Sequence, residues 1–279
     1  MADKLPTLIG VTLPSSPLLE PVLAHVRKHT SPSTVNHSIR SAYWALYLAT
    51  HVPQFASAPP GAINHSLIAL GCIMHDLGWA TTRSLLSDDK RFEVDGANLA
   101  VKFIEDNRSV LESSAEHKHT WDKTDMITLW DAIALHTAPS IAHNHPKPEV
   151  VLVQFGIFTD FLGPNLPPPF PPGLLSKDQY VEVLKAFPRE GFHDEWVQVF
   201  CGLCREKPDT TLDNWQCQIG LAYGTDGKGG GKEEFKKKVD AVNFVQMLEG
   251  ALKGCKEIEP EEKLSKPRSE REKYWYEAE

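Results

Sequence analysis

Two adjacent side chains, His75 and Asp76, could bind one divalent metal ion together. An imidazole and a carboxylate are both common ligands of first-row transition metals. The pair follows the apolar run from Ser66 to Met74, so both groups lie where a predicted helix ends and can reach the same ion. A histidine-aspartate pair also arises by chance, and the prediction therefore depends on further ligands.

Further ligands are available at His37, upstream of the pair, and at Asp160, far downstream. Asp160 lies on the apolar segment 148–161, where an unpaired buried carboxylate costs several kcal/mol that a cation would offset. Arg40, one helical turn after His37, could brace an acidic ligand. We therefore predict a metal site formed by His37, His75, Asp76 and Asp160.

Two imidazoles and two carboxylates suit zinc, with iron(II) and manganese as alternatives, and they leave coordination positions for water or substrate. Taken alone, His37 could instead be a capping or core histidine. Asp160 could likewise lie near water in a terminal helical turn. The order of the four residues along the chain favours the metal site.

These ligands require helices to position them. Apolar residues recur at helical spacing from Val35 to Ala49, after the N-cap signal Ser33-Thr34. Asn64 caps the run that leads to His75, and Gly78 is placed to end it. Helices are predicted near 18–27, 35–50, 66–74, 97–106, 123–136, 148–161, 176–187, 192–206, 211–223 and 233–253.

No convincing alternating pattern predicts a sheet, and the fold class is therefore all-α. The proline-rich stretch 164–173 must be a loop; it could wall a pocket after Asp160, although a rigid surface connection is the simpler interpretation. We predict a lead with one short helix at 1–32 and a metal-binding helical domain at 33–223. A flexible link, a final helix and a charged tail follow at 224–279, so the C-terminal helices are peripheral.

Composition excludes several other functions. The chain has 279 residues, 37 acidic against 29 basic ones, and a formal charge of −8, which argues against a nucleic-acid partner without a local basic patch. No segment resembles a secretory signal or a membrane span, and we expect a cytoplasmic protein without membrane partners. The five cysteines, including the pair Cys201 and Cys204, indicate free thiols. A small-molecule substrate fits best, and homo-oligomerisation stays open.

Several local motifs resemble those of a known family. The order His…His-Asp…Asp resembles the HD-domain metalloenzymes, and the fuller text over about residues 33–165 is similar to their fungal cyanamide hydratase-like branch. The motifs that carry the resemblance are Asn36-His37-Ser38-x-Arg40, Met74-His75-Asp76-Leu77-Gly78, Arg91-Phe92-Glu93-x-x-Gly96-Ala97 and Ala134-x-His136-Thr137.

The resemblance implies a helical bundle that holds one zinc ion through the four predicted ligands, with His136 near the substrate. A bound divalent cation makes hydroxide available near pH 7, and in this branch the hydroxide would add to a nitrile-type carbon such as that of cyanamide, giving urea. His136 could then orient the substrate or supply a proton. Glu93 is a second candidate acid or base, or else a solvated acid at a helix start.

Two alternatives stay open. In a phosphohydrolase acting on nucleotides, cationic groups should line the pocket, but only Arg40, Arg83, Lys90 and Arg91 lie near the motifs. In a non-catalytic helical module, the protein should fill every coordination position of the metal. Some phosphohydrolase relatives carry extra metal-binding histidines, for which His117, His119, His143 and His145 are candidates, although surface histidines explain them better.

Overall fold

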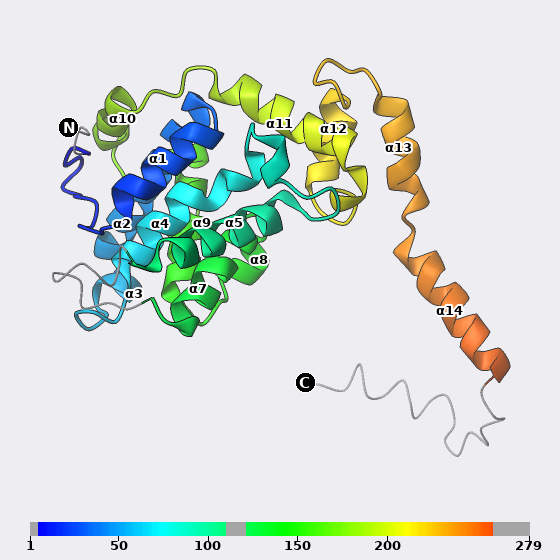
Figure 1. Ribbon diagram of the computed structural model, residues 1–279, viewed down its shortest axis with the longest axis horizontal. Coiled ribbons are helices and arrows are strands. Elements are labelled where there is room, and N and C mark those ends of the chain that lie inside the picture. The colour runs from blue at the N-terminus through cyan, green and yellow to red at the C-terminus, as the bar shows by residue number, and fades with distance from the viewer. Residues whose placement is uncertain (1–4, 110–120, 259–279) are drawn as a thin grey trace. The chain divides into compact units, whose positions relative to one another are not determined.

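The structure, a computed structural model, describes residues 5–109 and 121–258. Within these residues it consists of helices and loops without a β-strand, apart from an isolated bridge between Leu8 and Val11 (Figure 1). The predicted all-α fold class is confirmed. The chain divides into two compact units, Met1–Phe235 and Lys236–Glu279.

The first unit contains most of the helices. They are α1 Leu19–His29, α2 Pro32–His51, α3 Pro53–Ala56, α4 His65–Met74, η1 His75–Trp79, η2 Arg83–Leu85, α5 Phe92–Asp106, α7 Lys123–Ala134, α8 Pro139–Ala142, α9 Pro148–Leu162, α10 Lys177–Ala186, α11 Phe192–Glu206, η3 Pro208–Thr210 and α12 Gln216–Tyr223. Helix α13, Lys232–Ala241, begins in this unit and ends in the second, which contains α14, Phe244–Ile258.

Helix α2 is the central helix of the first unit. Its start is determined by Ser31, whose side chain accepts a hydrogen bond from the Thr34 N–H, and by a proline in the first turn. Its residues are buried on nearly every face, and the helix packs against α4 and α9. The close approach to α9 depends on Gly156, where an added Cβ would lie 2.5 Å from the Ser41 carbonyl oxygen. This packing brings the faces that carry His37 and Asp160 together.

Helix α4 ends at Met74, and the chain continues as the 3₁₀ turn η1 through His75 and Asp76. Asn64 caps α4 as predicted, because its side chain accepts from the Leu67 N–H at 3.0 Å. Gly78 is needed for close packing, since a Cβ there would lie 1.9 Å from the Phe92 carbonyl oxygen. The turn is therefore held against the start of α5.

Three expectations need correction. The N-cap of α2 is Ser31 rather than Ser33 or Thr34. Helix α5 begins at Phe92 rather than near residue 97, so Asp95 lies in its first turn, where Oδ2 accepts from Lys207 Nζ at 2.7 Å. The single helix predicted at 233–253 is divided into α13 and α14. Asn243 accounts for the division, because its Oδ1 accepts from the Gln246 N–H at 2.9 Å and starts a new helix.

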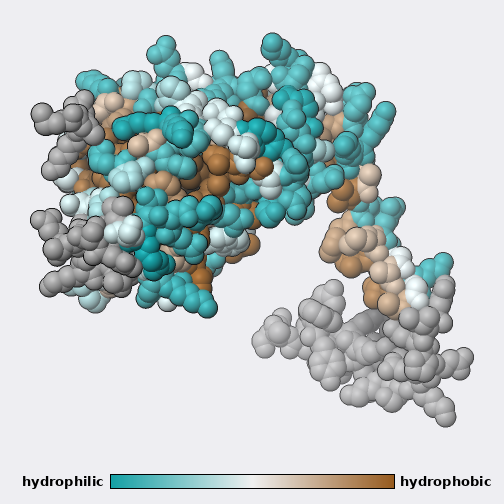
Figure 2. Space-filling model, in the orientation of Figure 1, coloured by the Kyte–Doolittle hydropathy of each residue, from teal (hydrophilic) through white to brown (hydrophobic). Residues whose placement is uncertain are grey.

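The loop at 164–173 contains no helix, as predicted, and its Phe170 packs against Phe155 of the core. In the second unit, Figure 2 shows apolar side chains on α14, among them the exposed Phe244, Met247 and Leu252. No helix within residues 5–109 and 121–258 combines the length and the apolar character required to cross a bilayer.

Candidate metal centre and its cavity

His37 from α2 and Asp160 from α9 meet in the interior. The side chains are 1% and 0% exposed, and His37 Nδ1 lies 2.7 Å from Asp160 Oδ2. Arg40 approaches the same carboxylate with two N–H groups, from Nε to Oδ1 and from Nη2 to Oδ2, each at 2.7 Å. Trp44 Nε1 donates to Oδ1 at 3.1 Å. Four donors therefore surround one buried carboxylate.

This surrounding keeps Asp160 ionised. Burial by itself raises the pKa of this carboxyl, but the hydrogen bonds and positive charge of Arg40, with His37, hold the pKa well below its usual range. A carboxylate has about four lone-pair sites, and the four donors use them. Asp160 was expected to bind the ion directly, but the structure places it behind His37, on the Nδ1 side of the ring. Arg40 braces an acidic residue as expected.

His75 and Asp76 are brought together by the turn η1. Asp76 has non-helical backbone angles inside this turn, and both side chains point inward, with exposures of 1% and 2%. Asp76 Oδ2 lies 3.1 Å from His75 Nε2 and 3.8 Å from His37 Nε2. Ligand atoms of these three residues all lie within 4.8 Å of one another. The structure thus brings together three of the four predicted ligands.

Hydrogen bonds determine which ring nitrogen of each histidine carries the proton. His75 Nδ1 lies 2.7 Å from the Cys72 carbonyl oxygen, which can only accept, so Nδ1 is protonated. His37 Nδ1 likewise donates to the ionised Asp160. In a neutral imidazole the remaining nitrogen, Nε2, then holds a lone pair. Burial, its largest influence, lowers the pKa of His37 although Asp160 raises it, which favours the neutral ring.

Asp76 adds a buried carboxylate beside these lone pairs. Both of its carboxylate oxygens are buried, and neither has a hydrogen-bond donor among the residues that the structure describes. Burial by itself raises the pKa of Asp76, and positive charge at His75 and then at His37 lowers it below its ordinary value. With neutral rings, a bound cation would supply that positive charge. Lone pairs that converge on a buried charge without a proton between them repel one another. A divalent cation would remove this repulsion, so the three residues fit a metal ion.

His136 follows α7 and lies beside these residues. Its Nδ1 donates to the Ile133 carbonyl oxygen at 2.6 Å, which leaves the Nε2 lone pair unused by this bond. Its ring centroid is 4.9 Å from that of His75. Burial, followed by the neighbouring His75, lowers the pKa of His136 to about 4. The ring is therefore neutral at physiological pH.

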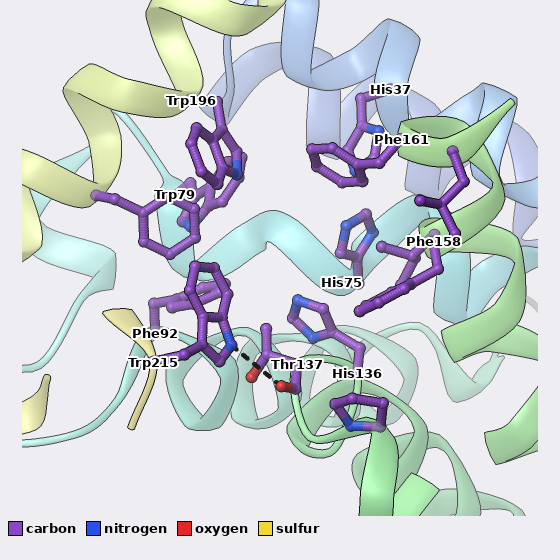
Figure 3. Close-up of a pocket in the computed structure, with 14 residues that line it drawn as sticks. His37, His75, Trp79, Phe92, His136, Thr137, Phe158, Phe161, Trp196 and Trp215 are labelled. Atoms are coloured by element: carbon purple, nitrogen blue, oxygen red, sulfur yellow. Dashed lines mark hydrogen bonds between the residues drawn. The ribbon is translucent and has the colours of Figure 1, made fainter. Parts of the chain in front are cut away.

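A cavity of about 330 Å³ opens onto the histidines. Figure 3 shows His37, His75, Phe158 and Phe161 along one side, and Trp79, Phe92, Trp196 and Trp215 along the other, with His136 between the two groups. The remaining lining residues are Thr137, Pro139, Ile157, Leu162 and Phe200. No lysine, arginine, aspartate or glutamate of the described residues lines this space.

Glu93 lies outside the cavity lining. It is fully buried, and its Oε1 accepts from Arg91 Nη2 and from Gln216 Nε2, both at 2.7 Å, and from the Thr137 hydroxyl. Thr137 does line the cavity. In this structure Glu93 therefore connects α5, α12 and the residue after His136, and its oxygens face donors of the protein.

Three residues of the aromatic side lie outside every motif of the sequence. Trp196 and Phe200 belong to α11, and Trp215 lies just before α12. One signal was present: Trp196 and Phe200 are four residues apart, on one helical face. Nothing in the sequence indicated that this face meets the histidines.

The additional histidines lie elsewhere or outside the described residues. His143 is exposed, and its Nε2 contacts Gln154 Oε1. His145 pairs with Asp131 at 3.4 Å. Neither lines the cavity. His117 and His119 lie outside the described residues.

Fold and site together define a helical protein with a buried His/His/Asp centre at the end of an aromatic cavity. Residues 34–153 match the family model described as the HD domain. This match supports the HD-domain metalloenzyme superfamily as the class of that segment. HD domains bind divalent metals and are typically metal-dependent hydrolases. The matched residues include His37, His75, Asp76 and His136 but end before Asp160. No curated protein sequence matches the chain.

Proposed function

We propose that this protein is a metal-dependent hydratase that adds water to a small nitrile-type group, as in the conversion of cyanamide to urea. The observation that carries the proposal is an aromatic cavity, without charged side chains in its described lining, that ends at His37 and His75, whose ligand atoms converge with those of Asp76. His37, His75 and Asp76 would hold the ion, and zinc suits this donor set. When bound, such an ion lowers the pKa of a water molecule to about 7.

The residues of the chain would handle the proton. Addition of water to the C≡N group forms a carbon–oxygen bond and turns one π bond into an N–H bond, which gives the imidic acid. Transfer of the second water proton from oxygen to nitrogen then converts the remaining C=N bond into the C=O bond of the amide. His136 Nε2 holds a free lone pair, so it can accept the proton of the attacking water and then donate it to the substrate nitrogen. The Ile133 carbonyl oxygen fixes the ring in this tautomer.

Glu93 would act by positioning. Its contact with the Thr137 hydroxyl holds the residue beside His136 against the cavity. Arg91 and Gln216 also donate hydrogen bonds to Glu93. The protein itself therefore balances the charge of this buried carboxylate, and no bound substrate is needed to do so.

The absence of cationic groups from the described lining favours this proposal over a nucleotide phosphohydrolase. Phosphate needs positive charge around it, but Arg40 is engaged by Asp160 and Arg91 by Glu93. Arg83 and Lys90 are exposed and pair with Asp88 and Asp89. A purely structural metal site should be closed by four protein ligands, whereas this group of three adjoins a cavity.

The test is a paired assay on the purified full-length chain. Metal content is measured by mass spectrometry, alongside urea formation from cyanamide, amide formation from simple nitriles and phosphate release from nucleotides. We expect about one divalent ion per chain and nitrile-type turnover, both lost in His75→Ala and kept in His143→Ala, the matched exposed histidine. Phosphate release without amide or urea formation would overturn the hydratase assignment. Full activity in metal-free protein would overturn the metal centre as well.

A further inference from the structure

The cavity is much larger than the smallest nitrile-type substrate requires. Its volume is about 330 Å³. Cyanamide, with a three-atom skeleton, fills on the order of 60 Å³, judged from the ≈30 Å³ share of one water molecule in the liquid. A small molecule at the histidines would leave most of the cavity to water. Water next to so much aromatic surface is unfavourable.

The walls are chemically uniform away from the histidines. Trp196 and Phe200 form one wall with Trp215. Trp196 packs edge to face on Phe200 and nearly parallel to Trp215, Phe200 is tilted against Trp215, and the centroids are 5.0–6.4 Å apart. Phe158 and Phe161 of α9 stand opposite. The two walls meet where Phe161 and Trp196 are in edge-to-face contact, with centroids 6.3 Å apart. Such surfaces bind flat apolar bodies by ring contacts and area burial.

Apolar side chains at this site are also exposed. Phe158, Phe161 and Leu162 are 37%, 41% and 38% exposed, although all three line the cavity. Isolated exposed apolar residues are common, but three beside one cavity indicate a surface that a ligand covers.

The charged side chains of this region lie outside the cavity lining. Arg189 lies near the Phe192 ring, with 5.5 Å from its Cζ to the ring centroid, and donates to the Tyr180 hydroxyl. Arg40 donates to Asp160 in the interior. No described cation or anion lines the cavity, so a charged body would lose hydration without compensation.

We infer that the substrate is a neutral nitrile whose apolar body is about the size of a phenyl ring, held against the α9 phenylalanines and the Trp196 wall with its C≡N group at the histidines. This inference rests on the proposed hydratase function and names its substrate class. Hydration then converts an aryl or arylalkyl nitrile and one water into the corresponding primary amide, with no other reactant.

The experiment compares cyanamide, acetonitrile and phenylacetonitrile as substrates of the metal-loaded full-length protein. We expect kcat/KM for phenylacetonitrile to exceed that for the two small molecules at least about tenfold, mainly through KM, because apolar contacts discriminate by such factors. Phenylacetamide should quench tryptophan fluorescence and inhibit competitively. Trp196→Ala should reduce the preference for phenylacetonitrile about tenfold. Trp130→Ala removes a tryptophan of similar exposure on α7, outside the cavity, and should leave the preference unchanged.

The outcomes separate this inference from the function on which it rests. Faster turnover of cyanamide than of phenylacetonitrile would overturn the inference and leave the hydratase proposal standing. Phenylacetamide binding that depends on Trp196, without turnover of any nitrile, would support the ligand class and overturn hydration. Absence of both turnover and binding would overturn the inference. Circular dichroism and metal content of each variant exclude misfolding as the cause.

Discussion

Asp76 and Asp160 are two buried aspartates of one centre with opposite surroundings. Asp160 accepts hydrogen bonds from Arg40, His37 and Trp44, whereas neither oxygen of Asp76 has a hydrogen-bond donor among the described residues. The carboxylate of Asp160 is compensated by the protein itself. The carboxylate of Asp76 has no such compensation from the described residues, and a cation bound between it and the two imidazole lone pairs would provide it.

Asp76→Asn should therefore abolish metal binding without destabilising the metal-free protein. The wild type should gain stability from metal, about 2.7 kcal/mol at a free metal concentration 100 times Kd, and the variant should gain none. In excess EDTA the variant should unfold at the same temperature as the wild type or higher, because a buried unpaired charge is removed. Thermal unfolding with and without metal tests this, with Asp131→Asn as the control. Retained metal in Asp76→Asn would contradict it.

Asp160→Asn should destabilise the protein strongly, because it leaves the Arg40 guanidinium buried and unpaired. Removing one member of a buried ion pair costs about 3–5 kcal/mol. The control Asp106→Asn disrupts only the exposed pair with Lys102 and should cost at most about 0.5 kcal/mol. Urea denaturation measures both. Equal stability of the two variants would refute the role of Asp160.

The pH dependence of this effect has a defined sign. Because the pKa of Asp160 is lower in the folded protein than its unfolded value of about 3.9, its stabilisation is complete above that value. The stabilisation is lost as pH falls through the folded-state pKa. The free-energy gap between wild type and Asp160→Asn should thus be constant from about pH 5 to 7 and narrow below about pH 4. A gap that widens on acidification would contradict the assignment.

At the scale of elements, the centre depends on the distance between α2 and α9. Small residues on the facing surfaces allow the two helices to approach closely: an added Cβ on Gly156 would meet the Ser41 carbonyl oxygen at 2.5 Å and the Ala45 Cβ at 2.6 Å. Since α2 carries His37 and α9 carries Asp160, this approach sets the hydrogen bond between them.

Gly156→Ala should push the two helices apart. Overpacking of this kind costs about 1–3 kcal/mol, and it should also weaken metal retention because His37 would lose its fixed orientation. The matched control is Gly250→Ala in α14, where an added Cβ meets nothing within 4 Å and helix propensity improves by up to about 1 kcal/mol. Denaturation midpoints and metal affinity measure the effects. If Gly156→Ala is destabilised but binds metal with unchanged affinity, the metal centre does not depend on the close approach of α2 and α9.

At the scale of the whole molecule, every residue assigned to the centre and the cavity lies in the unit Met1–Phe235. Phe235, at the end of this unit, is buried and lies against Gly220 of α12. Helix α14 belongs to the second unit and contributes no described residue to the cavity lining.

A chain that ends at Ala241 should therefore keep its metal and its turnover. The truncation retains all of α13, including Phe235, and removes α14. Metal content, thermal unfolding and nitrile hydration of the truncated and full-length proteins provide the comparison. Loss of metal from a folded truncated protein would show that the second unit contributes to the site.

Much of the architecture was predictable because helical periodicity is local. The apolar spacing of α2, the Asn64 cap of α4 and the uniformly apolar α9 each depend on neighbouring residues, and the helices formed at nearly the predicted bounds. The spacing of Arg40 after His37 likewise predicted that Arg40 would brace an acidic side chain.

The sequence by itself determined the ligand types and the helices that carry them, since residue identity and helical period need no knowledge of distant contacts. Only the tertiary structure decided which atoms converge. Asp160 approached the Nδ1 side of His37, where Arg40 and Trp44 use its remaining lone pairs, and Glu93 turned toward Thr137 and Gln216. The Trp196 wall joined the histidines across a long stretch of chain. Side-chain direction and the packing of distant helices set these contacts, and neither is encoded in local spacing.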